Sequence, residues 1–215
     1  KWLKGYPEIL LRVHGNYLEA AGQPALPANL GTPAAANSRL VSNAGPAIWE
    51  VSHSPVLPAA SQAVVVTARL HDPDGLGTRV VKYRVDPSAT YTTVNLKDDG
   101  TSGDAISGDG VYAATIPGQA TGAMVAFYVE ATDSGSPTAT TRFTSDAPTR
   151  ECLVYFGTTQ PSGNFPFYNL WITQATANKW STREKNSNKA LDGTFAYNNT
   201  RVVYNIGTLY SGSPW

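Results

Sequence analysis

Three stretches of the chain, 63–71, 79–85 and 124–132, alternate between apolar and polar residues. A period of two places successive side chains on opposite faces, so each stretch predicts a β-strand with one face in a core. The residues predicted to face the core are Val64, Val66, Ala68 and Leu70, then Val81, Tyr83 and Val85, then Val125, Phe127, Val129 and Ala131. A shift of one residue would expose such a face, so the pairing register is well specified.

Turn-forming residues separate these stretches from further short runs of strand character. The additional predicted strands cover 47–51, 91–96, 111–116, 138–144 and 151–156. Charged residues make up only 15% of the chain, while 19 glycines and 15 prolines supply many turns, and this composition favours an all-β fold. Short strands at this spacing over roughly 110 residues are typical of an immunoglobulin-like or fibronectin-III-like β-sandwich.

We assign the sandwich to residues 46–157. Residues 1–45 are rich in small residues and prolines and show no clear period, so they predict an irregular N-terminal segment or linker. Residues 158–215 predict a small mixed C-terminal extension, with a helix at 173–185 and a strand at 200–204.

The C-terminal extension has too few apolar residues to fold alone. We therefore expect its large aromatic side chains, Trp171, Trp180 and Phe195, to pack on a neighbour.

Charge and hydropathy exclude two classes of partner. The formal net charge is zero, so no overall field favours nucleic acid or an anionic membrane. The sequence contains no apolar run of about 18 residues, so we expect no membrane insertion. The chain opens at Lys1 without a signal peptide, and we expect a mature product or an excerpt from a longer protein.

A loop of aspartates and glycines at 97–112 is the main candidate site. Its carboxylates are Asp98, Asp99, Asp104 and Asp109, and its glycines are Gly100, Gly103, Gly108 and Gly110. One interpretation is a tightly turning connection, because glycine tolerates positive φ and aspartate caps its own backbone. The other is a Ca²⁺ site, although the spacing lacks the closing glutamate of the helix-flanked calcium loop.

The residues that usually carry catalysis form no pattern here. His14, His53 and His71 lack the spacing of a zinc site, and we expect each at the surface or in a turn. The single Cys152 permits no intramolecular disulfide and predicts a small buried apolar group. No Gly-x-Ser-x-Gly elbow occurs between a strand and a helix. We predict no catalytic residue, no cofactor-binding residue and no enzyme.

Several motifs give the 46–157 region a specific resemblance. They are Pro55-Val-Leu-Pro58, His71-Asp-Pro-Asp-Gly75, Lys82-Tyr-Arg-Val85, Gly108-Asp-Gly-Val-Tyr112 and Phe127-Tyr-Val-Glu-Ala-Thr-Asp133. Together they resemble the immunoglobulin-like modules of large secreted bacterial proteins. The resemblance implies spacing and presentation of other domains, and an extracellular or cell-surface location.

The flanks resemble two other families. Residues 31–38 are similar to the exit of a lamin-tail-like domain, with Ala34 where that family has glycine. Residues 168–183, 191–195 and 201–215 are similar to the opening of CotH-type kinase domains. The resemblance implies that the nucleotide- and metal-binding acidic residues lie beyond Trp215, so these 215 residues carry no kinase activity of their own.

Two further functions remain open beside that of a spacer or adhesion module. One is a fragment of an atypical kinase without its catalytic residues. The other is a carbohydrate-binding module, because aromatic faces bury the apolar faces of sugars. Of five tryptophans only Trp49 lies in the sandwich, so Trp49 is the candidate glycan contact. The expected partners are neighbouring domains of a longer chain, glycans or cell-surface components.

Overall fold

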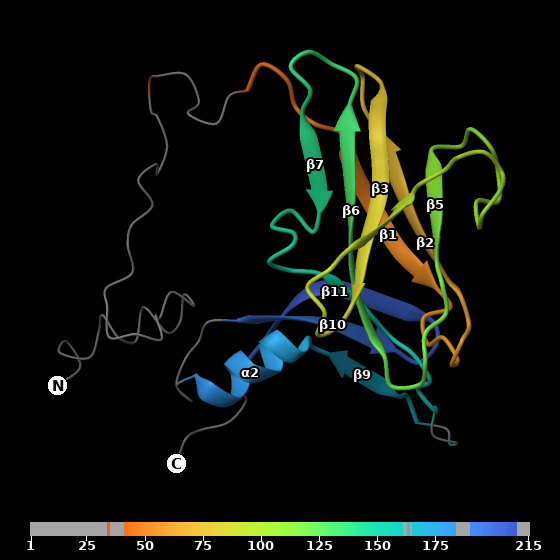
Figure 1. The fold of residues 1–215 in the computed structure, drawn as a ribbon, viewed down its shortest axis with the longest axis vertical. Helices are drawn as coiled ribbons and strands as arrows, with labels where there is room; N and C mark the ends of the chain where they lie inside the picture. Colours follow the sequence, from red (N-terminus) through yellow and green to blue (C-terminus); the bar gives the residue numbers. More distant parts are fainter. Residues whose placement is uncertain (1–33, 35–40, 161–162, 164, 184–189, 210–215) are drawn as a thin grey trace.

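A computed structural model describes residues 34, 41–160, 163, 165–183 and 190–209 (Figure 1). Most of the predicted linker therefore lies outside the described residues. The described chain is built of antiparallel strands with one short helix, and the all-β prediction is confirmed. No helix among these residues is long and apolar enough to cross a membrane.

Two sheets pack face to face. The first has the order β1-β2-β5, and the second has the order β4-β3-β6 with two short strands on the remaining edge of β6. The strands of the first sheet are β1 (Ala47–Ser54), β2 (Val64–His71) and β5 (Val111–Ile116). Those of the second are β3 (Leu76–Val85), β4 (Thr92–Asn95), β6 (Met124–Asp133), β7 (Thr140–Phe143) and β8 (Cys152–Tyr155).

Strands β7 and β8 share one edge of β6. β7 pairs with the stretch 129–132 of β6, and β8 pairs with the stretch 124–127. The peptide between the two short strands leaves the sheet and returns to it. Among the strands of the described chain, β8 pairs with β6 alone, so its other edge has no strand partner.

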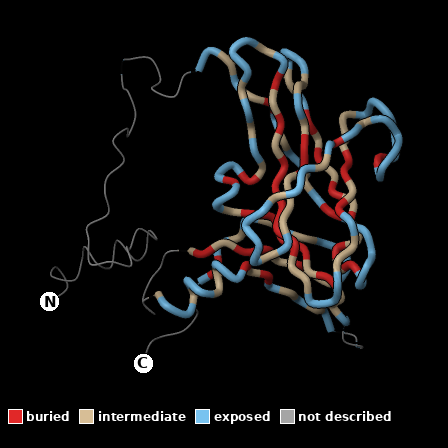
Figure 2. The backbone as a smooth tube through the Cα atoms, in the orientation of Figure 1, coloured by how far each residue is buried: buried red, intermediate tan, exposed pale blue. Residues whose placement is uncertain are grey.

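The core lies between the two sheets, where the alternating residues of β2 and β6 meet (Figure 2). The predicted inward residues of these two strands are all buried, as are Val81 and Cys152. Tyr83 is half-buried against the core, and Val85 is 36% exposed. The prediction for Val85 was wrong because β4 pairs with β3 only from Val80 to Tyr83, so β6 alone lies beside the last residue of β3.

The C-terminal segment forms a second, smaller sheet of order β11-β10-β9. Its strands are β9 (Tyr168–Trp171), β10 (Leu191–Tyr197) and β11 (Arg201–Thr208), and helix α2 (Gln174–Thr182) follows β9. The helix begins where the Thr173 side chain accepts the N–H of Thr176, which satisfies one of the free amides of the first turn. The helix was predicted at nearly the same place.

The small sheet packs on the end of the sandwich through Trp171. This side chain is buried in a cluster with Val56, Ala126, Leu153 and Ala196. Trp180 and Phe195 are only half-buried. The expectation that the extension packs on a neighbour is thus met by Trp171, while Phe195 lies on the opposite face of the small sheet.

Candidate functional site

The aspartate loop connects β4 to β5. Lys97 and Ala113 close its base, because each donates its backbone N–H to the carbonyl of the other, at 2.9 and 2.8 Å. Its far end is held to β2 through Gly103, which has a φ of +99° and lies against Val65. A β-carbon at Gly103 would come within 2.5 Å of Val65 Cγ1, so both the conformation and the close approach require glycine.

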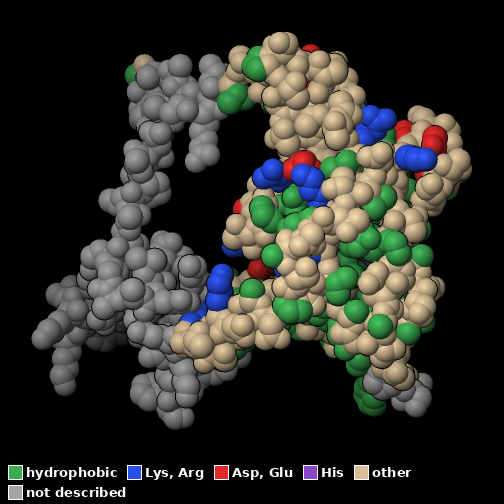
Figure 3. Space-filling model, in the orientation of Figure 1, with side chains coloured by type: hydrophobic (Ala, Val, Ile, Leu, Met, Phe, Trp, Pro, Cys, Tyr) green, Lys and Arg blue, Asp and Glu red, His purple; other side chains and the backbone are tan. Residues whose placement is uncertain are grey.

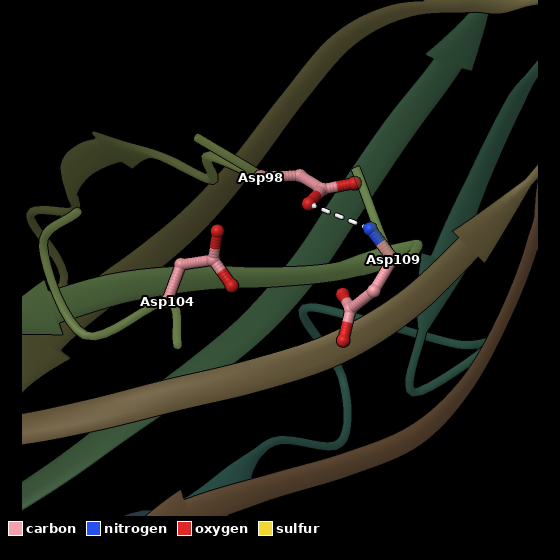
Figure 4. A group of neighbouring side chains, drawn as sticks. All are labelled: Asp98, Asp104 and Asp109. Atoms are coloured by element: carbon pink, nitrogen blue, oxygen red, sulfur yellow. Dashed lines mark hydrogen bonds between the residues drawn. The ribbon is translucent and has the colours of Figure 1, made fainter. Parts of the chain in front are cut away.

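Asp98 organises the second half of the loop (Figure 4). Its Oδ1 accepts the N–H of Gly108 at 2.6 Å and of Asp109 at 3.3 Å, and its Oδ2 accepts the N–H of Gly110 at 3.1 Å. Asp109 in turn accepts the N–H of Val111 at 2.9 Å. These carboxylates therefore serve as caps for the turn that leads into β5.

Asp104 organises the first half. The side chain is buried, and its Oδ2 accepts the N–H of Gly100 at 2.6 Å while its Oδ1 accepts that of Ile106 at 3.4 Å. The carboxylates of Asp98, Asp104 and Asp109 turn toward one another, with ligand atoms all within 4.8 Å (Figure 4). The sequence thus predicted three residues that the fold brings together.

Asp99 stands apart from this cluster. It accepts bonds from the backbone and the hydroxyl of Thr101, at 3.0 and 2.5 Å, and lies 3.8 Å from Lys97 Nζ. The hydroxyl bond from Thr101 is the main cause that lowers the pKa of Asp99. Asp99 is therefore not placed to share an ion with the other three.

The chemistry of the cluster suits a hard cation. Ca²⁺ takes about six to eight oxygen ligands, and a carboxylate oxygen that accepts one N–H keeps a second lone pair. Three side chains supply part of such a set, and backbone carbonyls would have to supply the rest. The observed amide bonds fully explain the loop as turn chemistry, so Ca²⁺ binding stays a prediction.

Trp49, the candidate glycan contact, lies on β1 opposite Arg69 and is 41% exposed. Within the described part of the chain no second aromatic ring stacks on it. The structure therefore offers a sugar a single ring at this position.

The three histidines differ in their surroundings. His14 lies outside the described residues, and His71 is exposed as expected. His53 is only 2% exposed, so the prediction of a surface histidine was wrong. It was wrong because β11 covers His53, and nothing in the local sequence signals a partner 151 positions away.

His53 makes two polar contacts that sequence analysis missed. Its Nε2 lies 3.1 Å from the carbonyl oxygen of Val56, and its Nδ1 contacts the hydroxyl of Tyr204 on β11. Since a carbonyl only accepts, Nε2 carries the proton and Nδ1 accepts from Tyr204. Burial lowers the pKa of His53 to about 4, so the imidazole is neutral near pH 7.

A buried ion pair lies on the outer face of the second sheet. Arg84 donates from Nε and Nη2 to the two carboxylate oxygens of Glu151, at 2.8 and 2.5 Å, and from Nη1 to Asp86 at 2.9 Å. The Tyr91 hydroxyl donates to Glu151 as well. Asp86 also accepts the N–H of Gln174 at 2.7 Å, so the network reaches the first turn of α2.

The alternation of 79–85 predicts Arg84 on the outward face of its strand. The side chains of Arg84 and Glu151 are only 11% and 5% exposed. Burial is the first cause that raises the pKa of Tyr91 to about 12, and the bond to Glu151 adds to it. The alternation of β3 correctly excluded Arg84 from the core. It carried no information on Asp86, Tyr91 and Glu151, which form the network around Arg84 on the outer face.

Cys152 is buried, as the sequence predicted. It is fully enclosed in β8, and desolvation raises the pKa of its thiol well above the ordinary value. A thiol in this state is a poor nucleophile.

The side chains of β10 complete the free edge of β8. The N–H of Leu153 donates to the Thr194 hydroxyl oxygen, and the N–H of Glu151 donates to Asp192 Oδ2, each at 3.1 Å. On a strand, groups two residues apart face the same way, so two alternate side chains of β10 match the amide of Leu153 in β8 and that of Glu151 just before it. We call these two bonds the β8–β10 seam.

The fold and these contacts define an all-β sandwich with a small sheet joined to one end. No protein-family model matches the chain, and a search of curated proteins finds no match either.

Proposed function

We propose that this chain is a non-catalytic spacer module that holds neighbouring domains of a secreted or cell-surface protein in a fixed relative orientation. The observation that carries the proposal is the β8–β10 seam. A flexible linker has few bonds to the domains it joins, whereas here the segment that follows the sandwich supplies acceptors for sandwich amides.

Two other contacts of the same kind support it. The N–H of Leu57, in the loop after β1, donates to Asn199 Oδ1 at 2.8 Å, and Arg150 Nη1 donates to Asn205 Oδ1 at 3.1 Å. Both asparagines belong to the C-terminal segment. Together with buried Trp171, these bonds resist rotation of the small sheet about the sandwich.

The strand order supports the immunoglobulin-like or fibronectin-III-like character that we propose for the sandwich. Three strands, β1-β2-β5, face a larger sheet built on β3 and β6, and all neighbouring strands pair antiparallel. The resemblance of the flanks implies a lamin-tail-like neighbour before the module and a CotH-type kinase domain whose first strands are β9 to β11. An extracellular or cell-surface location is part of the same proposal.

Pulsed electron paramagnetic resonance between two spin labels tests the fixed orientation. Thr93→Cys on β4 and Arg201→Cys on β11 place labels at exposed positions of the sandwich and the small sheet. Cys152→Ala, in the parent protein and in the control variant, leaves the two introduced cysteines as the only thiols to label. We expect one narrow distance distribution.

A double variant provides the matched control. Asp192→Ala with Thr194→Val removes both acceptors of the seam, and we expect the distribution to broaden. A broad distribution in the parent protein would show that the small sheet swings freely, and the spacer proposal would fail.

A further inference from the structure

The outer face of the small sheet carries a row of aromatic rings. Tyr168 on β9 lies opposite Tyr197 on β10, and Phe195 lies one row further. The Tyr168 ring stacks on Phe195 with centroids 5.6 Å apart and lies 5.3 Å from the Tyr197 ring. Tyr168 is 56% exposed. This face is turned away from the sandwich, because the intervening residues Asn169 and Ala196 belong to the opposite face.

A hollow of about 380 Å³ opens beside these rings. Its lining includes Gln160, Phe165, Tyr197, Asn198, Asn199 and Thr200. Phe165 projects almost fully into solvent at its rim. The volume falls within the range of small-ligand sites, about 300 to 1,000 Å³, and none of the residues that line the hollow is charged.

The turn between β10 and β11 fixes the polar groups of the hollow. Asn198 Oδ1 accepts the N–H of Phe167 at 2.7 Å, and Asn199 Oδ1 accepts the N–H of Leu57 at 2.8 Å. Because the carbonyl oxygens are held in this way, each amide is oriented, and its NH₂ group has no hydrogen-bond partner among the described residues. The Thr200 hydroxyl donates to the carbonyl of Tyr197 at 3.1 Å, so its oxygen remains free to accept.

We propose that this face, formed by Tyr168, Tyr197, Asn198, Asn199 and Thr200, binds a neutral oligosaccharide. Sugar rings stack their apolar C–H faces on aromatic side chains, while amide donors and hydroxyl acceptors bond the hydroxyl groups at the ring edge. The face offers both kinds of contact side by side on β-strands and a tight turn. An uncharged lining favours a neutral glycan over an acidic one.

A protein partner is the competing occupant. An interface core between proteins is apolar at its centre, whereas this hollow exposes oriented amides and a hydroxyl oxygen beside the rings. Those polar groups favour a ligand that presents many hydroxyls. The site is distinct from Trp49, which lies on β1.

The test uses the 215-residue chain on an array of neutral α- and β-linked glucans, mannans, xylans and galactans, with uronic-acid glycans as the acidic comparison. A neutral oligosaccharide that binds is then titrated into ¹⁵N-labelled protein. We expect chemical-shift changes at Tyr168, Tyr197 and 198–200. We expect Tyr168→Ala to weaken binding about tenfold or more, because the stacking surface is lost.

Asn199→Asp is the sharper variant. It keeps the acceptor for Leu57 N–H and replaces the NH₂ donor, so the turn is preserved while binding falls. Trp49→Ala is the control and leaves binding unchanged. The proposal is overturned if no neutral glycan binds at millimolar concentration, if shifts map to Trp49, or if Tyr168→Ala has no effect. Self-association that Tyr168→Ala abolishes, without glycan binding, would assign the face to a protein contact and also overturn it.

Discussion

Thr194 and Leu153 are 41 positions apart, yet the hydroxyl oxygen of the first accepts the backbone N–H of the second at 3.1 Å. Both residues are fully buried. An edge strand normally exposes such amides to solvent or to another chain. In this protein the side chains of β10 take that place, so the sandwich and the small sheet share one hydrogen-bonded boundary.

We predict that Thr194→Val destabilises the chain by about 1–3 kcal/mol, because it leaves the buried Leu153 N–H without an acceptor while keeping the side-chain volume. Chemical denaturation measures the change in the free energy of unfolding. Thr194→Ser retains the hydroxyl and should lose less. Equal losses in the two variants would show that packing, and not the hydrogen bond, matters at this position.

Breaking the buried ion pair between Arg84 and Glu151 should destabilise the protein more than Thr194→Val does. Arg84→Met leaves the Glu151 carboxylate buried without its bidentate partner, and we expect a loss of about 3–5 kcal/mol in stability. Arg84→Met combined with Glu151→Gln removes both charges and should be more stable than the single variant. If the double variant is the less stable of the two, the coupling between Arg84 and Glu151 is not what the geometry implies.

Acidification should destabilise the protein through His53. The unfolded imidazole takes up a proton below about pH 6.5, while the folded one does so only near pH 4 because it is desolvated. In this window the unfolded chain binds more protons, so stability falls as pH falls. Denaturation of the parent and of His53→Gln across pH 4 to 6.5 measures the difference, and the variant should show a flatter slope.

Asp192 should have the opposite effect to His53 on how stability depends on pH. Burial raises its pKa to about 6 from an ordinary value of 3.8, and its Oδ1 has no hydrogen-bond partner among the described residues. Between these values the folded chain binds more protons, so protonation of Asp192 stabilises the fold as pH falls toward 4. Asp192→Asn keeps an acceptor for Glu151 N–H and should remove this gain. An unchanged pH profile in that variant would contradict the prediction.

The aspartate loop gives a prediction that does not depend on metal. Asp98→Ala removes the acceptor of three backbone amides at the loop surface, and we expect a loss of about 1 kcal/mol, whereas Asp99→Ala should have little effect. A loss from Asp99→Ala as large as that from Asp98→Ala would contradict this assignment.

Calcium is tested separately, by thermal unfolding with excess Ca²⁺ and then with a chelator. A ligand bound only by the folded state raises its stability by RT ln(1 + [L]/Kd). A rise that disappears in Asp104→Ala would assign an ion to the cluster, and no rise would leave the loop as turn chemistry.

The sequence predicted the strands of the sandwich well because their pattern is local, but it predicted neither β9 nor β10. Alternation within β2 and β6 marks a buried face whatever lies opposite it, and the inward residues of both strands are buried. Glycines and aspartates marked the turns for the same reason. The burial of Val85 was predicted wrongly because it depends on where the neighbouring strand β4 ends.

Contacts between distant segments could not be predicted in this way. His53 and Tyr204 meet only because β11 returns across the sandwich, and neither residue has a neighbour in sequence that signals the other. The spacing of Asp192 and Thr194 matches the amides of β8, but an aspartate and a threonine two residues apart are common on any strand. The outer aromatic face likewise required the pairing of β9 with β10.

Cys152 is the single thiol of the chain, and it lies in β8 next to the seam. A thiol reagent can reach it only when β8 separates from its surroundings. The rate of alkylation therefore reports how often this boundary opens, with no label introduced. Variants of the seam should increase the alkylation rate of Cys152. This rate is therefore an internal measure of how firmly the small sheet is held to the sandwich.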